Sequence, residues 1–163
     1  MNAIRQAATV ASQAMRAKGT PEVFSPGPMT PSLTPELALR YLRELSADVR
    51  GGVALDGAGR LVAGDPELAG PGADAAAALG PAQAAEAVLR SGAVFAARAG
   101  GLTLLVVCGP RAIPPLARQD LAQTVAALGH EPSAAGAGAA APAGLPRDVA
   151  EALISAAPRG PGE

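Results

Sequence analysis

A glycine-rich turn between two short apolar runs is the feature that most restricts the fold of this chain. It reads GGVALDGAGRLVAG over Gly51–Gly64. A nucleotide phosphate loop needs a helix directly after its glycines, whereas here a second β-type run follows. Gly57 and Gly59 can take a positive φ, and Asp-Gly between apolar runs is typical of a hairpin. The stretch therefore predicts a β-hairpin, whose buried positions are Val53, Leu55, Leu61 and Ala63.

A helix is predicted immediately before the hairpin. Thr34 can cap the helix N-terminus, and Pro35 suits the first helical position. The apolar spacing continues as far as the diglycine at Gly51, which we expect to end the helix. The side chains expected on its buried face are Ala38, Tyr41, Leu42, Leu45 and Val49.

Further helices and strands are predicted after the hairpin. Residues 65–72 have loop composition, and 73–90 are expected to form two short helices separated at Gly80-Pro81. Residues 93–109 predict two strands joined by a diglycine, and the second of these strands is so continuously apolar that we expect it to be central. A last helix is expected to begin at Pro114-Pro115 and to end at Gly129.

These elements predict an α+β domain over residues 34–130, with an antiparallel sheet of four or five strands flanked by helices. Residues 1–33 are expected to form a weak alanine-rich helix and a flexible proline-rich tether. Residues 131–163 are expected to be a flexible Ala/Gly/Pro tail. Within that tail, 145–156 is either a short helix that binds a groove or a frayed end with chance periodicity.

Composition limits the partners and the location of the chain. The formal net charge is −1 and the charges are interspersed, so we expect neither nucleic acid nor a membrane surface as a partner. A single cysteine, Cys108, fits a reducing cytoplasm. The first 20 residues share their basic composition with organelle transit peptides, but the Ala, Gly and Pro excess favours a GC-rich bacterial gene.

This sequence contains few residues that could act as a catalytic base, nucleophile or metal ligand. His130 is the only histidine and follows the last helix, where it suits capping or exposure better than base catalysis. Cys108 ends an apolar strand and is interpreted as a small buried hydrophobe. One histidine and one cysteine cannot supply a set of transition-metal ligands without carboxylates. We therefore predict no enzyme activity, no metal and no cofactor.

The order helix, hairpin, helix, hairpin, helix resembles the roadblock (dynein light chain) family of profilin-like and longin-like α/β sandwiches. The matching segments are 37–64 and 94–128, with LTLLVVCG at the place of the family's most apolar strand. One departure concerns the edge strand between the second helix and the last hairpin, where two subunits of the family pair. Only Ser91-Gly92 separates the helix expected to end at Arg90 from the next strand, so we expect this edge strand to be absent or merged.

The resemblance implies a non-catalytic regulator or scaffold that binds a small Ras-like GTPase in bacterial signalling, polarity or motility. It also implies a homodimer or hetero-oligomer, in which the sheet edge, the hairpin turn and the neighbouring loops form the binding surface. On that surface we expect Asp56, Arg60 and Arg98 as polar contacts of the partner.

A small-molecule sensor of GAF or PAS type is the alternative, because such domains also have helices flanking a sheet. Their pockets usually have an aromatic lining and several convergent polar groups. This chain has no Trp, and its aromatic residues are Phe24, Tyr41 and Phe95. We therefore predict a protein-binding function rather than a small-molecule sensor.

Overall fold

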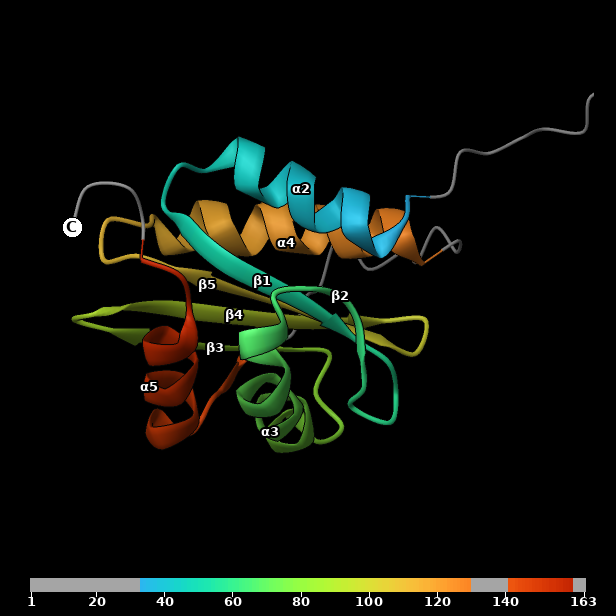
Figure 1. Ribbon diagram of the computed structural model, residues 1–163. Helices are drawn as coiled ribbons and strands as arrows, with labels where there is room; N and C mark the ends of the chain where they lie inside the picture. The colour runs from blue at the N-terminus through green and yellow to red at the C-terminus, as the bar shows by residue number, and fades with distance from the viewer. Residues whose placement is uncertain (1–32, 130–140, 160–163) are drawn as a thin grey trace, which may run out of the picture. The chain divides into compact units, whose positions relative to one another are not determined.

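The computed structural model describes residues 33–129 and 141–159 (Figure 1). The predicted N-terminal helix and tether, apart from Leu33, lie outside these residues, as do His130 and the parts 131–140 and 160–163 of the predicted Ala/Gly/Pro tail. The elements are α2 Pro35–Leu45, β1 Val49–Leu55, β2 Leu61–Gly64, the 3-10 turn η1 Pro66–Leu68, α3 Ala69–Leu79, β3 Ala84–Leu89, β4 Gly92–Ala99, β5 Leu102–Cys108, α4 Pro114–Leu128, β6 Ala143–Gly144 and α5 Arg147–Ala156.

One six-stranded sheet forms the centre of the described domain, in the order β2-β1-β5-β4-β3-β6. All neighbouring strands are antiparallel except β3 and β6. Helices α2 and α4 cover one face, and α3 and α5 cover the other (Figure 1). The predicted α+β class is confirmed, and the short strand β6 adds a sixth strand to the four or five expected.

Helix α2 begins where the sequence indicated but ends earlier. The Thr34 hydroxyl accepts a hydrogen bond from the Leu37 amide at 3.3 Å, which confirms the cap. The helix ends at Leu45, and the diglycine lies inside β1 rather than at a helix end. A Cβ at Gly52 would lie 2.9 Å from Leu39 Cδ2 and 3.2 Å from the Leu105 carbonyl oxygen. The glycine therefore permits α2 to pack tightly on the strand.

The buried face of α2 also differs from the prediction. Ala38, Leu39 and Leu42 are its buried residues, whereas Tyr41 and Leu45 are 45% and 46% exposed. The predicted buried face is rotated around the helix axis relative to the observed one, because Tyr41 and Leu45 fit the apolar spacing but lie on the flank of the helix. In addition, Val49 is half-buried and begins β1.

The predicted hairpin is formed by β1 and β2, which are joined at Asp56. Of the two turn glycines, Gly59 has a positive φ of 76°, and Gly57 has none. The register shifts between Ala54 and Leu55, which interrupts the expected alternation. Leu61, expected to be buried, is consequently 40% exposed on the edge strand.

The prediction of a second helix within 73–90 is wrong, because Ala84–Leu89 is strand β3. It pairs with β4 along its whole length, from Ala84 opposite Ala97 to Leu89 opposite Gly92. The preceding helix α3 begins earlier than expected, at Ala69. Alanine has the highest helix propensity, but intrinsic propensity amounts to less than about 1 kcal/mol per residue, and the main-chain pairing with β4 outweighs it here. The edge strand expected to be absent is therefore present.

Strands β4 and β5 and helix α4 lie where they were predicted. Strand β5 is buried from Thr103 to Cys108, between β1 and β4, which confirms its central place. Its side chains alternate between two cores. Leu105 and Val107 face the core under α3 and α5, and Leu104 and Val106 face the core under α2 and α4.

Residues 143–157 pack against the domain. Helix α5 lies within the range in which a short helix was one of two interpretations. Leu145, Leu153 and Ile154 are buried in the same core as α3.

Substituting Gly64→Ala should lower the free energy of unfolding by more than about 2 kcal/mol. Gly64 has a φ of 105°, and a Cβ there would lie 2.2 Å from the Gly52 carbonyl oxygen. Urea denaturation followed by circular dichroism measures the change. Gly70→Ala is the matched control, because no atom lies within 4 Å of a Cβ at that position. Its stability should stay unchanged or rise by up to about 1 kcal/mol, and equal losses in both variants would contradict the interpretation.

Candidate functional site

A partly open cavity of about 490 Å³ lies where the β1–β2 turn, the end of α3 and the β4–β5 hairpin meet. Glycine and alanine make up most of its lining, and its polar side chains are those of Asp56, Arg98 and Thr103. Small side chains leave the main chain of the turns accessible to a bound group. The cavity therefore contains one carboxylate, one guanidinium and one hydroxyl, and its other lining residues have no polar side chain.

Arg98 on β4 holds the end of α3. Its Nη1 donates to the Gly80 carbonyl at 2.7 Å, its Nη2 to the Ala76 carbonyl at 3.0 Å and its Nε to Thr103 Oγ1 at 3.3 Å. The last carbonyls of a helix lack intrahelical partners and carry partial negative charge, so a guanidinium stabilises them. Arg98 is thus a structural clamp between the sheet and the helix end.

Asp56 closes the β1–β2 turn. Its Oδ1 accepts the amides of Ala58 and Arg60, each at 2.9 Å, and its Oδ2 accepts Arg60 Nε at 2.8 Å. The hydrogen bond from the Arg60 amide is the largest cause that lowers the pKa of this carboxyl, followed by that from the Arg60 side chain. The Arg60 side chain is 81% exposed. The turn therefore presents an ion pair whose cation is on the outside.

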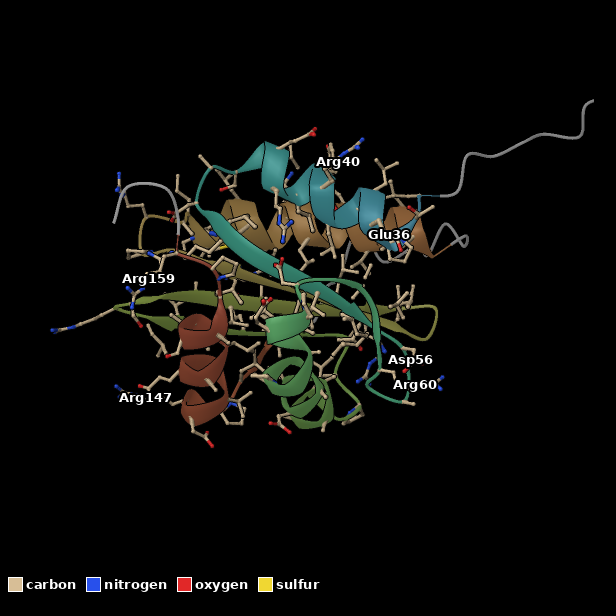
Figure 2. All side chains as sticks on the ribbon, in the orientation of Figure 1. Glu36, Arg40, Asp56, Arg60, Arg147 and Arg159 are labelled. Carbon is tan, nitrogen blue, oxygen red and sulfur yellow. The ribbon has the colours of Figure 1, made fainter. Side chains whose placement is uncertain are left out.

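The three predicted contact residues lie at one end of the sheet. The structure brings Asp56 and Arg98 into one cavity, while Arg60 reaches this site through its ion pair with Asp56. Figure 2 shows Asp56 and Arg60 at the same end of the sheet as Glu36, near the start of α2. Arg98 is half-buried, and its Nε, Nη1 and Nη2 each donate a hydrogen bond within the domain. It therefore differs from the exposed charge at a strand end that the sequence predicted. Their contact with a partner stays a prediction.

Sequence reasoning missed a second surface, formed by exposed apolar side chains along α2 and at the start of α4. Leu37, Tyr41 and Leu45 recur at every fourth residue of α2 and are 41–46% exposed. Ile113 and Leu116 at the start of α4 are 59% and 53% exposed. We call these five residues the α2–α4 seam. Their helical spacing was visible in the sequence, but Tyr41 and Leu45 were assigned to the core.

Two ion pairs indicate on which flank of its helix Tyr41 and Leu116 each lie. Residues of a helix are 100° apart around its axis, so Arg43 lies on the flank of α2 opposite to Tyr41. Arg43 reaches Asp65 beside β2, which leaves Tyr41 on the flank toward α4. On α4, Arg118 reaches Glu86 of β3, which leaves Leu116 on the flank toward α2. Tyr41 and Leu116 therefore lie on the flanks by which α2 and α4 face each other.

Other chemically active groups in the described ranges are few. No group of three or more His, Cys, Asp or Glu side chains there could hold a metal ion. None of the helices in these ranges is long and apolar enough to span a lipid bilayer. Burial, and secondarily the charge of Asp48, raise the pKa of the Cys108 thiol from 9.0 to about 12, so it is protonated at neutral pH.

Replacing Arg98 with Met should lower the free energy of unfolding by about 1–3 kcal/mol, because two carbonyls at the end of α3 lose a charged donor. Urea denaturation measures this loss. Arg60→Met is the matched control, since it breaks an exposed ion pair and should cost less than about 1 kcal/mol. A smaller loss for Arg98→Met than for the control would refute the clamp.

Cys108 should make the fold less stable as the pH rises above about 9. The unfolded thiol loses its proton near 9.0, whereas the folded thiol keeps it up to about 12. The unfolded state then binds fewer protons, so stability falls by up to about 1.4 kcal/mol per pH unit in this window. Urea midpoints of the wild type and Cys108→Ala at pH 8 to 11 test this. The two pH profiles should diverge above pH 9, and parallel profiles would contradict the burial effect.

Comparison with known structures identifies the fold. The chain is similar to a roadblock/LC7 domain from Streptomyces avermitilis, with 20% identity and a TM-score of 0.50, over 55% of this chain and 90% of that one. A further roadblock/LC7 domain structure from the same organism has 21% identity and a TM-score of 0.47, over 54% and 91%. No protein-family model and no curated protein matches the sequence. The likeness at a TM-score of 0.50, together with the sheet order and the helices on both faces, shows that this protein has the roadblock fold.

Proposed function

We propose that this chain is a non-catalytic regulator or scaffold that binds a protein partner, and that the partner is a small Ras-like GTPase in a bacterial cytoplasm. The observation that carries the proposal is the α2–α4 seam. Its five large apolar side chains are between 41% and 59% exposed on two neighbouring helices. Apolar side chains grouped in this way on a small domain are typical of a surface that another protein covers.

The seam has the composition of a binding surface. A tyrosine with four aliphatic neighbours supplies a large, stiff anchor and apolar area, which commonly carry most of the energy at an interface. Charged residues of α2 border it, among them Glu36 and Arg40. A partner on the seam would therefore bury an apolar strip within a polar rim.

The proposal includes polar contacts at the end of the sheet. The β1–β2 turn lies at the same end as the start of α2 (Figure 2), so a partner that extends past Leu37 would reach Asp56 and Arg60. Arg60 is the most available of the three proposed contacts because its side chain is 81% exposed. Arg98 would contribute through the donor positions that the α3 carbonyls and Thr103 leave free.

The cavity at Asp56 and Arg98 does not favour the small-molecule sensor. Ligand pockets enclose most of the ligand surface and are lined by apolar and aromatic groups. This cavity is partly open to solvent, and glycine and alanine supply most of its lining. The seam, in contrast, provides apolar area of the kind that a protein partner needs.

Tyr41→Asp should weaken binding of the GTPase by at least about tenfold, because a charge would be buried at the centre of the interface. The measurement is biolayer interferometry with the full chain against small GTPases loaded with GDP or with a non-hydrolysable GTP analogue. We expect the affinity to depend on the nucleotide state. Val62→Asp is the control, since Val62 is 42% exposed on β2 away from the seam.

The proposal fails if no small GTPase binds at micromolar concentration in either nucleotide state. Loss of binding in Val62→Asp alone would place the contact on the β2 edge instead. Arg60→Glu should weaken binding by about threefold to tenfold, as expected for an exposed charge at the rim. An unchanged affinity would exclude the turn from the interface.

A further inference from the structure

The cavity at the end of the sheet lies where two apolar rows of the core end in polar side chains. Residues two apart on a strand share a face. Leu105 and Val107 of β5 belong to the core under α3, and Thr103 continues their row. On β4, Ala96 belongs to the same core and Arg98 continues its row. Thr103 and Arg98 are register partners, so a hydroxyl and a guanidinium lie side by side on the α3 face.

Helix α3 leaves the space beside these two side chains open. Its contribution to the lining of the cavity is Ala73, Ala76 and Ala77, each of which ends at its Cβ. Protein interiors contain few voids larger than a water molecule, which takes up about 30 Å³ in the liquid. The cavity of about 490 Å³ is much larger than such a void and is partly open to solvent. It can therefore admit a side chain of another protein.

Hydrogen-bond donors remain available in this cavity. Thr103 is 2% exposed, and its Oγ1 accepts Arg98 Nε at 3.3 Å. Its hydroxyl hydrogen has no acceptor in the part of the chain that the structure describes. A guanidinium has five N–H groups, of which Thr103 and the carbonyls of Ala76 and Gly80 engage three, so two remain. An acceptor with two oxygens would satisfy donors of both side chains.

The charges around the cavity select the kind of acceptor. The oxygens of Asp56 already accept the Ala58 amide and the amide and Nε of Arg60, so they offer little to a cation. Together with the negative end of α3, the Asp56 carboxylate disfavours a phosphate group, which carries up to about two charges. A carboxylate carries one charge and has the planar pair of oxygens that a guanidinium binds best. It therefore fits this cavity better than a cation or a phosphate.

We propose that this cavity receives the carboxylate of one Asp or Glu side chain of the protein partner, with Arg98 and Thr103 as its hydrogen-bond donors. The inference rests on the proposed function, because it takes the small GTPase as that partner, and it adds the chemistry of one contact. Arg60 lies at the β1–β2 turn beside the cavity, and its side chain is 81% exposed. Its positive charge would attract an approaching acidic side chain.

A titration with a blocked amino acid tests the site without a GTPase. The full chain, labelled with ¹⁵N, is titrated with N-acetyl-glutamate-N-methylamide at constant ionic strength and followed by NMR. The amides of Gly57, Gly59 and Gly101, which line the cavity, should shift and saturate with a Kd in the millimolar range. The same derivative of glutamine is the control. It has nearly the same shape but no charge, so it should cause no saturating shift.

Substitutions of two buried threonines test the role of the hydroxyl. Thr103→Val removes the donor at nearly constant size and should weaken binding of the blocked glutamate by about threefold to tenfold. Thr103→Ser keeps the hydroxyl and should bind as the wild type does. Thr124→Val is the matched control, because Thr124 is also 2% exposed but its hydroxyl donates to the Asp120 carbonyl within α4 at 2.7 Å. Circular dichroism verifies that each variant is folded.

The affinity for the GTPase connects the site to the partner. Thr103→Val should weaken GTPase binding by a similar factor, whereas Thr124→Val should leave it unchanged. Equal shifts from the blocked glutamate and the blocked glutamine would overturn the proposal. So would a GTPase affinity that is the same in the wild type and in Thr103→Val. If the blocked glutamate binds but no small GTPase does, the carboxylate site is supported and only the proposed GTPase is excluded.

Discussion

The close packing of helix α2 on strand β1 determines how the remainder of this domain is arranged. Gly52 lets Leu39 contact the strand where a side chain would collide, and Gly64 lets β2 pass the same point. Asp65 Oδ2 accepts the Gly52 amide at 2.9 Å and also binds Arg43, so one carboxylate links strand, turn and helix. With one flank of α2 held in this way, its other flank lies beside α4. The apolar seam between the two helices is a direct consequence of that packing.

The two faces of the sheet are completed by different means. Helices α2 and α4 cover one face and leave apolar side chains exposed between them. Helices α3 and α5 cover the other, and α5 reaches it only because the chain crosses the β3 edge. The domain therefore has a face that offers apolar surface and an edge that its own C-terminal residues occupy. We propose a GTPase as the partner of the apolar surface.

The polar site at the end of the sheet has mainly a structural role within the chain. Arg98 stabilises the end of α3, and Asp56 fixes the turn through the amides of Ala58 and Arg60. Such fixed groups can still contact a partner, since they would lose little conformational entropy on binding. Arg60 combines an anchored guanidinium with an exposed position, which explains why it is the most available of the three proposed contacts.

Local chemistry in the sequence determined several elements of this protein. The cap at Thr34, the Asp-Gly turn, the continuous apolar run of β5 and the prolines that begin α4 all act within a few residues of the chain. Together with the order of these elements, they were sufficient to predict the roadblock fold and the end of the sheet where Asp56 and Arg60 lie. Only the tertiary structure decided that 84–89 is a strand, that Tyr41 lies outside the core and that residues 143–157 cover an edge. The alanines of 84–89 favour a helix locally, but tertiary context overrides intrinsic propensity, so contacts between residues distant in the sequence determine the conformation and the exposure of such segments.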